Sequence, residues 1–447
     1  MRILLKDRRI AVVSVIVIAF GLRLSAKVVF VGEGRFWIDT YREYYNISYN
    51  LNNGKGFCAS LNNNALLHAG IDQSILGRGC AHLPPGYPVI LSLVTTMDHD
   101  YVDCFQFNHR CRSDYWRIIL AQALMSTGTV ICTFFLGSHL FGRSTGLLAS
   151  LFAAVYPYYV WHDTSFQETG VFTFFTILSV LFLYKASRLR RKILWISTGV
   201  ACGATVLTRA NLAPFVGLAA LWLYRQNFSS TLRERLRSVL IFAVAFVIVL
   251  IPWLVRNSLV LGAPVITTQT GRFMWIGNNA NTFSHYPATY IDLSEAEAWQ
   301  SFTVSELEII RSLSTDEISQ SRWFFNRGLG FIVQNPRLTV LRALRKVWTG
   351  FSWNFSPVKE RLEQWVYFIS YFPILVLGVT GMWLTRLRWR ELGLIYLLFL
   401  TFVVSTAVFW AHTSHRTYLD VYLMVFAAHV CRVVCRKRQL WFGQILS

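Results

Sequence analysis

Hydrophobic and polar positions fall in long separate blocks along this chain. Runs of about twenty apolar residues predict membrane-spanning helices, because that length crosses the hydrocarbon core of a bilayer. The runs are found at 10–31, 115–139, 144–160, 169–186, 193–208, 211–224, 238–256, 365–385, 392–410 and 417–434. The sequence therefore predicts an all-α polytopic membrane protein with about ten transmembrane helices.

The first run carries Arg23 and Lys27 and lacks an A-x-A-like cleavage site, so we interpret it as a retained span rather than a signal peptide. The runs 193–208 and 211–224 are shorter than the bilayer core and meet at Thr208-Arg-Ala-Asn211. Short helices that meet at an arginine predict a cavity dipping into the membrane. One broken span with a shifted topology is the alternative interpretation.

Two long polar regions, 32–114 and 257–364, separate the apolar runs. The apolar piece 83–94 in the first region is short and interrupted by prolines, so we expect a re-entrant or interfacial segment there. The chain then divides into three parts: an N-terminal module 1–256 that includes the first loop, an amphipathic outer region 257–364, and C-terminal helices with a basic tail, 365–447.

A helix with one aromatic and one polar face is predicted just after the first span. At helical spacing one face collects Tyr41, Tyr44, Tyr45, Tyr49 and Leu51, and the other collects Asp39, Glu43, Asn46 and Asn50. Such a helix next to a span should lie flat at the interface. Thr40 and Glu43 fit a capping box, which would leave Asp39 free for another task. Alternatively, Asp39 is itself the N-cap.

The chain has 447 residues, of which 54% are hydrophobic, and 43 Lys and Arg outnumber 23 Asp and Glu. In a soluble protein this excess would suggest nucleic acid, but here the basic residues lie between apolar runs and fit the positive-inside rule. The dense clusters are at 2–9, 185–192, 225–237, 386–390 and 432–438. We therefore expect both termini in the cytoplasm, both polar regions on the outer face and no nucleic-acid partner.

Four of the eight cysteines, Cys58, Cys80, Cys104 and Cys111, lie in the first outer region. An even number on an oxidising face predicts one or two disulfides, and Cys104 with Cys111 would close a small loop. Their spacing does not fit a common metal cluster.

Acidic residues near the spans are few, so each is a candidate for chemistry. The outer-face acids are Asp39, Glu43, Asp163 and Glu168, although Ser165-Phe-Gln-Glu168 also fits a capping box. The basic candidates on the same face are His82, Arg209, Arg256, Arg272, Lys346, His415 and Arg416. Carboxylates beside several cations suit an anionic substrate that undergoes acid–base chemistry. The alternative is that these cations contact phospholipid headgroups at the ends of spans.

Arg209 is the strongest of the basic candidates, because it sits between two apolar helices. A buried arginine needs an anionic partner, and the adjoining helices contain no acid. We therefore expect a bound phosphate as its counter-ion.

Several short motifs resemble those of the GT-C superfamily of membrane glycosyltransferases. The group includes the dolichyl-phosphate-mannose protein mannosyltransferases and the bacterial aminoarabinose transferases. The matching pieces are Asp39 with Tyr44 and Asn53-Gly-Lys-Gly-Phe57, His82-Leu-Pro-Pro-Gly-Tyr-Pro88, Leu140-Phe-Gly-Arg143, Glu168-Thr-Gly-Val-Phe-Thr-Phe174, Leu207-Thr-Arg-Ala-Asn211, Arg256-Asn with Gly262, Ile276-Gly-Asn-Asn279, Asn335-Pro-Arg before Arg345-Lys346, and His415-Arg-Thr-Tyr-Leu-Asp-Val-Tyr422. Each is degenerate alone, but their order and spacing are specific for the superfamily.

The resemblance implies transfer of a sugar from a polyprenyl-phosphate donor to an acceptor hydroxyl on the outer face of a bacterial inner membrane. It implies that Asp39 is the general base of an inverting reaction and that Glu168 is the second acid. Arg209, Arg256, His82 and Arg416 would contact the donor, and Lys346, Glu43 and Asp163 are further substrate-binding candidates. Asp39 and Glu168 are the candidate ligands of a divalent cation such as Mg²⁺ or Mn²⁺. The acceptor would be a lipid, a glycan or a protein.

This sequence departs from the family at two places. Threonine follows Asp39 where several relatives have a second acid, and the last motif reads His-Arg-Thr-Tyr. Segment 98–112 resembles an insertion to which the family assigns no role. A transporter or lipid flippase is the competing hypothesis, because it too would place ionisable residues in short helices. A non-catalytic scaffold is a third.

Overall fold

The computed structural model of this protein describes residues 2–38, 41–61, 63–226 and 231–445. Most of this part is helical, and it also contains two short antiparallel strands, β1 (Ala59–Ser60) and β2 (Arg78–Gly79). The predicted all-α polytopic fold is therefore confirmed.

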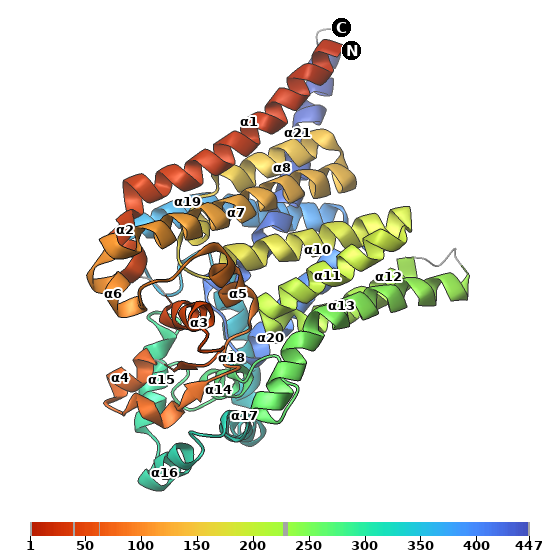
Figure 1. Cartoon of the computed structure of the whole chain (residues 1–447). Helices are drawn as coiled ribbons and strands as arrows, with labels where there is room; N and C mark the ends of the chain where they lie inside the picture. The colour runs from red at the N-terminus through yellow and green to blue at the C-terminus, as the bar shows by residue number, and fades with distance from the viewer. Residues whose placement is uncertain (1, 39–40, 62, 227–230, 446–447) are drawn as a thin grey trace.

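The membrane part is a bundle of ten helices (Figure 1). They are α1 (Arg2–Ala26), α7 (Arg112–Phe141), α8 (Arg143–Val155), α10 (Thr169–Leu189), α11 (Lys192–Thr208), α12 (Ala213–Gln226), α13 (Leu232–Leu261), α19 (Arg361–Leu384), α20 (Trp389–Val408) and α21 (Thr417–Ile445). Within the described residues, seven helices are long and apolar enough to cross a membrane. Of the other three, α11 and α12 correspond to the two short runs expected from the sequence. The run 144–160, expected as one span, is divided at Tyr156 into α8 and α9 (Pro157–Thr164).

The helices of the two polar regions gather together on one side of this bundle (Figure 1). The first region supplies α2 (Gly32–Ile38), α3 (Arg42–Asn52), α4 (Asn64–Ala69), α5 (Gly86–Val94) and α6 (Tyr101–Gln106). The second supplies α14 (Gln269–Gly277), α15 (Ile291–Gln300), α16 (Val304–Ser312), α17 (Glu317–Gln334) and α18 (Pro336–Phe351). Leu66 and Ile75 from the first region share a core with Trp275 and Trp299 from the second. The polar regions are therefore one layer, although more than a hundred residues of membrane helices separate them in the sequence.

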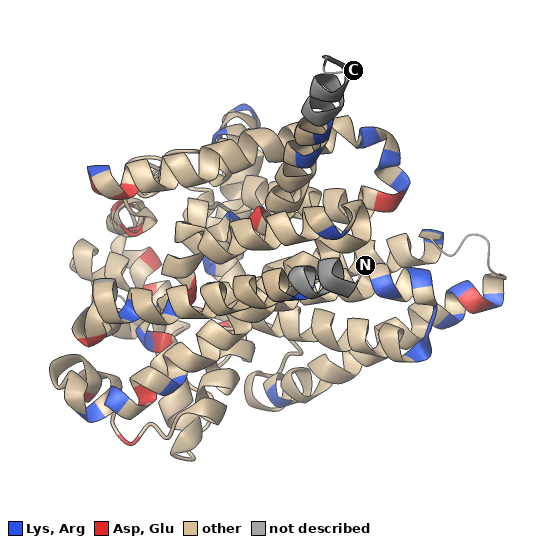
Figure 2. Cartoon of the chain, turned by 90° about the horizontal axis from the view of Figure 1, so that it is seen from above, with Lys and Arg blue, Asp and Glu red and all other residues tan. Residues whose placement is uncertain are grey.

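Charge is distributed unevenly between the two ends of the bundle (Figure 2). Most acidic residues lie at the end that carries the polar layer, and the opposite end carries mainly lysine and arginine. The basic clusters of the α10–α11 and α19–α20 connections belong to that second end. This asymmetry follows the pattern that the positive-inside rule describes.

The expected proline-broken segment forms α5, a helix of nine residues that begins directly after Pro84 and Pro85. Its first residue, Gly86, lies against the end of α11, where a Cβ atom would approach the carbonyl oxygen of Leu207 to 2.8 Å. Only glycine allows this close approach, which brings the first polar region to the junction of α11 and α12.

Helix α3 buries Tyr44 and Tyr45, as expected for its aromatic face. The helix begins at Arg42, and Tyr41 occupies the N-cap position without a side-chain hydrogen bond. Asp39 and Thr40 lie outside the described residues, and so does the predicted capping box of Thr40 with Glu43.

Candidate active site

An ion pair between Glu168 and Arg209 lies where α10 begins and α11 ends. The Nε atom of Arg209 is 2.7 Å from Oε1 of Glu168, and Nη2 donates to the Thr169 hydroxyl at 2.9 Å. The guanidinium also covers the Phe172 ring at 5.0 Å. Both side chains keep some contact with solvent, being 16% and 12% exposed. The pair is therefore fixed in orientation but accessible.

This pair corrects two expectations from the sequence. Glu168 is the N-cap residue of α10 and makes no side-chain cap, so the predicted capping box with Ser165 does not form. Arg209 has a carboxylate partner inside the protein, so it does not require a phosphate to neutralise it. The positive end of the α10 dipole also favours a carboxylate at this position.

Tyr44 connects α3 to the ion pair. Its buried hydroxyl forms a hydrogen bond with the Glu168 carboxylate. Burial raises the pKa of Tyr44 well above its usual value, and the negative charge of Glu168 raises it further, so the phenol stays protonated and donates. The ring packs edge-on against Tyr87 of α5, with centroids 5.0 Å apart. Three separate sequence segments thus meet at one carboxylate.

His162 of α9 (Pro157–Thr164) is a second group at this end of the bundle. Its side chain is buried, its Nδ1 contacts Gln167, and its Nε2 has no hydrogen-bond partner among the described residues. Burial, with the positive charge of Arg209, lowers the pKa of His162 to about 3. It is therefore a neutral imidazole at physiological pH.

His82 and Arg256 lie in the polar layer. His82 borders a cavity of about 20 Å³ with Arg272 and Glu317. Burial and the charge of Arg272 lower its pKa to about 3. Arg256 donates to the Cys80 carbonyl at 2.5 Å and covers the Trp253 ring at 5.0 Å. Neither residue forms a hydrogen bond or ion pair with Glu168 within the described part of the chain.

Three other predicted site residues are buried against protein partners. Asp163 pairs with Arg23 of α1 at 3.1 Å. Arg416 pairs with Asp420 at 2.9 Å and stacks on Tyr371. Lys346 is fully buried, and its ammonium donates to Asn278 Oδ1 at 3.0 Å and to the carbonyls of Ala407 and Val408 at 3.3 Å. Each connects elements of the fold, and contact with a substrate stays a prediction for all three.

Glu43 lies in the first turn of α3, half-buried, one residue before Tyr44. Asp39, the proposed base, lies outside the described residues, in the connection between α2 and α3. Within the described ranges no three His, Cys, Asp or Glu side chains are grouped for a metal ion. Glu168, the described member of the predicted metal pair, is bonded to Arg209 instead.

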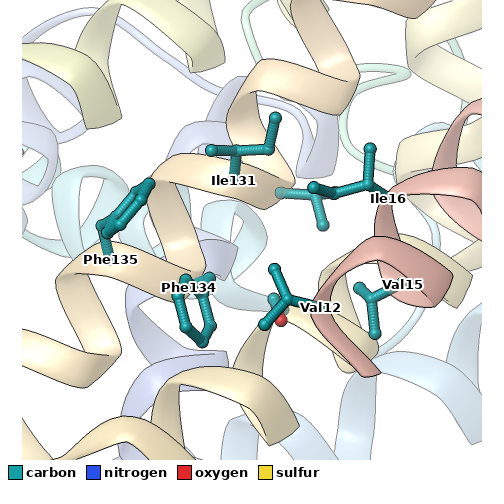
Figure 3. Close-up of a pocket in the computed structure, with 8 residues that line it drawn as sticks. Val12, Val15, Ile16, Ile131, Phe134 and Phe135 are labelled. Atoms are coloured by element: carbon teal, nitrogen blue, oxygen red, sulfur yellow. The ribbon is translucent and has the colours of Figure 1, made fainter. Parts of the chain in front are cut away.

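A cavity of about 90 Å³ lies elsewhere, among α1, α7 and α8 (Figure 3). Val12, Ile16, Ile131, Phe134 and Phe135 line it. Apolar walls of this kind offer no binding groups to a phosphate or a sugar hydroxyl, so this cavity is not a candidate active site.

Comparison with known proteins gives one sequence match. Residues 111–255 match the family of dolichyl-phosphate-mannose-protein mannosyltransferases. This segment includes Glu168 and Arg209. No curated protein sequence matches the chain.

The fold matches solved membrane-protein structures. The apo oligosaccharyltransferase of Archaeoglobus fulgidus aligns at a TM-score of 0.57 and 13% identity, over 98% of this chain and 51% of that one. The oligosaccharyltransferase AglB of the same organism, solved with an inhibitory peptide and a dolichol-phosphate, aligns at a TM-score of 0.54 and 13% identity. The alignment covers 97% of this chain and 51% of that one. This chain thus spans about half the length of that protein. ArnT from Cupriavidus metallidurans bound to undecaprenyl phosphate aligns at a TM-score of only 0.35 and 14% identity, over 94% of this chain and 77% of that one.

The resemblance inferred from the motifs is thereby confirmed: the chain shares its fold with AglB, and residues 111–255 match the family of dolichyl-phosphate-mannose-protein mannosyltransferases.

Proposed function

We propose that this protein is a membrane glycosyltransferase that transfers a sugar from a polyprenyl-phosphate donor to an acceptor hydroxyl. The observation that carries the proposal is the Glu168–Arg209 pair with Tyr44. It joins a carboxylate and a guanidinium, both in the segment that matches the mannosyltransferase family, to a phenol from α3. The structural neighbour AglB was solved with a dolichol-phosphate, a ligand of the same chemical class.

Arg209 is the proposed contact of the donor phosphate. Glu168 and Thr169 hold its Nε and Nη2, and Nη1 makes no hydrogen bond to the described part of the chain. A guanidinium fixed in this way offers its remaining N–H groups to a phosphate oxygen without losing its carboxylate partner. As the bond between the anomeric carbon and the phosphate oxygen breaks, charge develops on the phosphate, and Arg209 stabilises it.

Asp39 is the proposed general base. It accepts the proton of the acceptor hydroxyl while that oxygen attacks the anomeric carbon, and the polyprenyl phosphate leaves as an anion. A single displacement of this kind inverts the anomeric configuration. Glu168 acts by holding Arg209 and Tyr44 in place. No step is assigned to a divalent cation at Asp39 and Glu168, because the Glu168 carboxylate is bonded to Arg209.

The proposed location is a bacterial inner membrane with the polar layer on the periplasmic face and both termini in the cytoplasm. The charge asymmetry of Figure 2 supports this orientation, because the end with the polar layer carries most of the acidic residues and the opposite end is basic. The acceptor is a lipid, a glycan or a protein.

The test is transfer of labelled sugar from a polyprenyl-phosphate donor by purified protein in lipid nanodiscs. We expect transfer by the wild type and its loss in Glu168→Gln. Glu297→Gln is the matched control. Glu297 is an acid of the polar layer whose side chain is 42% exposed and pairs with His285. Equal activity of Glu168→Gln and the wild type would refute the site. Uphill movement of a solute or lipid without transfer would favour a transporter.

A further inference from the structure

A small helix closed by a disulfide lies against the first two outer helices. The disulfide joins Cys104 in α6 to Cys111, at the end of a 3₁₀ turn (Asn108–Cys111) that leads directly into α7. Figure 1 shows α6 beside α2, at the outer end of the bundle. This is the segment that resembles an insertion relative to the family.

The segment is attached to α2 on one side. The hydroxyl of Tyr101 donates to the backbone carbonyl of Trp37 at 2.7 Å, and both side chains are buried. Arg112, directly after the disulfide, lies 3.6 Å from Glu33. These contacts hold both ends of α2, and Trp37 lies two residues before Asp39 in the sequence.

The same segment is attached to α3 on the other side. The hydroxyl of Tyr45, which is fully buried, donates to the His99 carbonyl at 3.0 Å and lies 3.0 Å from the Cys104 sulfur. The guanidinium of Arg42, the first residue of α3, covers the Tyr101 ring at 5.1 Å. Tyr45 is the immediate neighbour of Tyr44, which bonds to Glu168.

The two faces of α6 differ. Tyr101 and Cys104 point inward and are buried, while Val102 and Phe105 are 56% and 45% exposed. A helix of six residues is not stable by itself, because it has too few hydrogen bonds to offset nucleation. The disulfide ties Cys104 to the end of the 3₁₀ turn and so restricts the chain that follows α6. This restriction keeps the buried face of α6 ordered.

We propose that the disulfide-closed segment 100–111 is a positioning element for the active site. It bridges α2 and α3, the helices on either side of Asp39, and thereby holds Tyr44 against Glu168. The inference rests on the proposed glycosyltransferase function. The segment touches none of the reacting groups itself, so Tyr101 and the disulfide act through α2 and α3.

The test compares Cys104→Ser/Cys111→Ser and Tyr101→Phe with the wild type and with Gln106→Ala, an exposed position on the same helix. We expect kcat to fall about tenfold to a hundredfold in the first two, because a displacement of about 1 Å at a catalytic group costs that much. The KM for the donor should change less than about threefold. Gln106→Ala should keep wild-type kinetics.

Hydrogen–deuterium exchange over residues 32–52 provides a readout that needs no activity. We expect faster exchange there in Cys104→Ser/Cys111→Ser and in Tyr101→Phe, with exchange in α10 unchanged. Unchanged exchange over 32–52, or faster exchange with wild-type kcat, would overturn the proposal. If the double cysteine variant does not fold, Tyr101→Phe, which keeps the disulfide, decides. If the wild type transfers no sugar, the proposed function fails, and the exchange measurement still decides whether the segment holds α2 and α3.

Discussion

The carboxylate of Glu168 lies 2.7 Å from the Nε atom of Arg209, although 41 residues separate them in the chain. Glu168 directly precedes α10 and Arg209 directly follows α11, so the pair joins two helices at their outer ends. Desolvating an arginine at such a junction requires an anion nearby. The protein supplies that anion itself, which leaves the guanidinium oriented before any substrate arrives.

Arg209→Lys should keep the fold and weaken use of the donor. A lysine ammonium preserves the charge opposite Glu168 but cannot bond to Glu168, Thr169 and a phosphate in the fixed geometry of a guanidinium. We expect a loss of kcat/KM of about a hundredfold, and near-complete loss in Arg209→Ala. Kinetics with donor and acceptor varied separately check this prediction. A defect confined to the acceptor would remove Arg209 from the phosphate site.

Asp39→Asn should abolish transfer while the melting temperature stays near that of the wild type. The structure places Tyr41 at the N-cap position of α3, two residues after Asp39 in the sequence. Loss of an N-cap would cost about 0.5–2 kcal/mol of stability. Activity within a few-fold of the wild type would exclude the general-base role, and a drop in stability of that size would instead indicate a structural role.

Peptide mapping under non-reducing conditions should find Cys58 joined to Cys80 and Cys104 joined to Cys111, the pairs that the structure shows. The thiols of Cys132, Cys202, Cys431 and Cys435 should be free. Both disulfides belong to the polar layer, so they would form in an oxidising compartment. Four free thiols in place of the pairs would contradict the outer location of this layer.

Much of the fold could be predicted from the sequence, because bilayer thickness fixes the length of an apolar helix. Nine of the ten expected runs each correspond to one helix of the bundle, the run 144–160 is divided between α8 and α9, and the short runs 193–208 and 211–224 do meet at Arg209. The packing of the two polar regions into one layer could not be predicted. It depends on contacts such as that of Asn63 with Glu295, 232 residues apart, which no local pattern records.

The candidate site was only partly predictable for the same reason. The sequence indicates Glu168 and Arg209 as separate candidates, because acids and arginines near apolar runs are rare. Their pairing, and the addition of Tyr44, depend on how α3, α10 and α11 pack. Asp420 was missed although its spacing of four from Arg416 was a usable signal, since residues at that spacing share a helix face.

Asp163→Asn should destabilise the protein strongly. The Asp163 side chain pairs with Arg23 of α1 inside the bundle, where the arginine is fully buried and also donates to the carbonyls of Ala19 and Ala154. Removing the charge of one partner leaves a buried arginine uncompensated, at a cost of about 3–5 kcal/mol. Thermal unfolding in nanodiscs measures this. The double variant Arg23→Met/Asp163→Leu should recover most of the loss, and failure to do so would argue against the ion pair as the cause.

The stability of the polar layer should depend on pH through Lys346. Burial, with the nearby charge of Arg342, lowers the pKa of Lys346 from 10.5 to about 7. Between pH 7 and the usual lysine pKa, the unfolded chain therefore holds a proton at this residue that the folded protein has released. Stability rises with pH wherever the unfolded state binds more protons, so the wild type should become more stable from pH 7 to pH 9. Lys346→Met lacks this titration. The melting temperature of the wild type minus that of Lys346→Met should therefore increase over this range, and a constant or falling difference would show that Lys346 keeps its proton when folded.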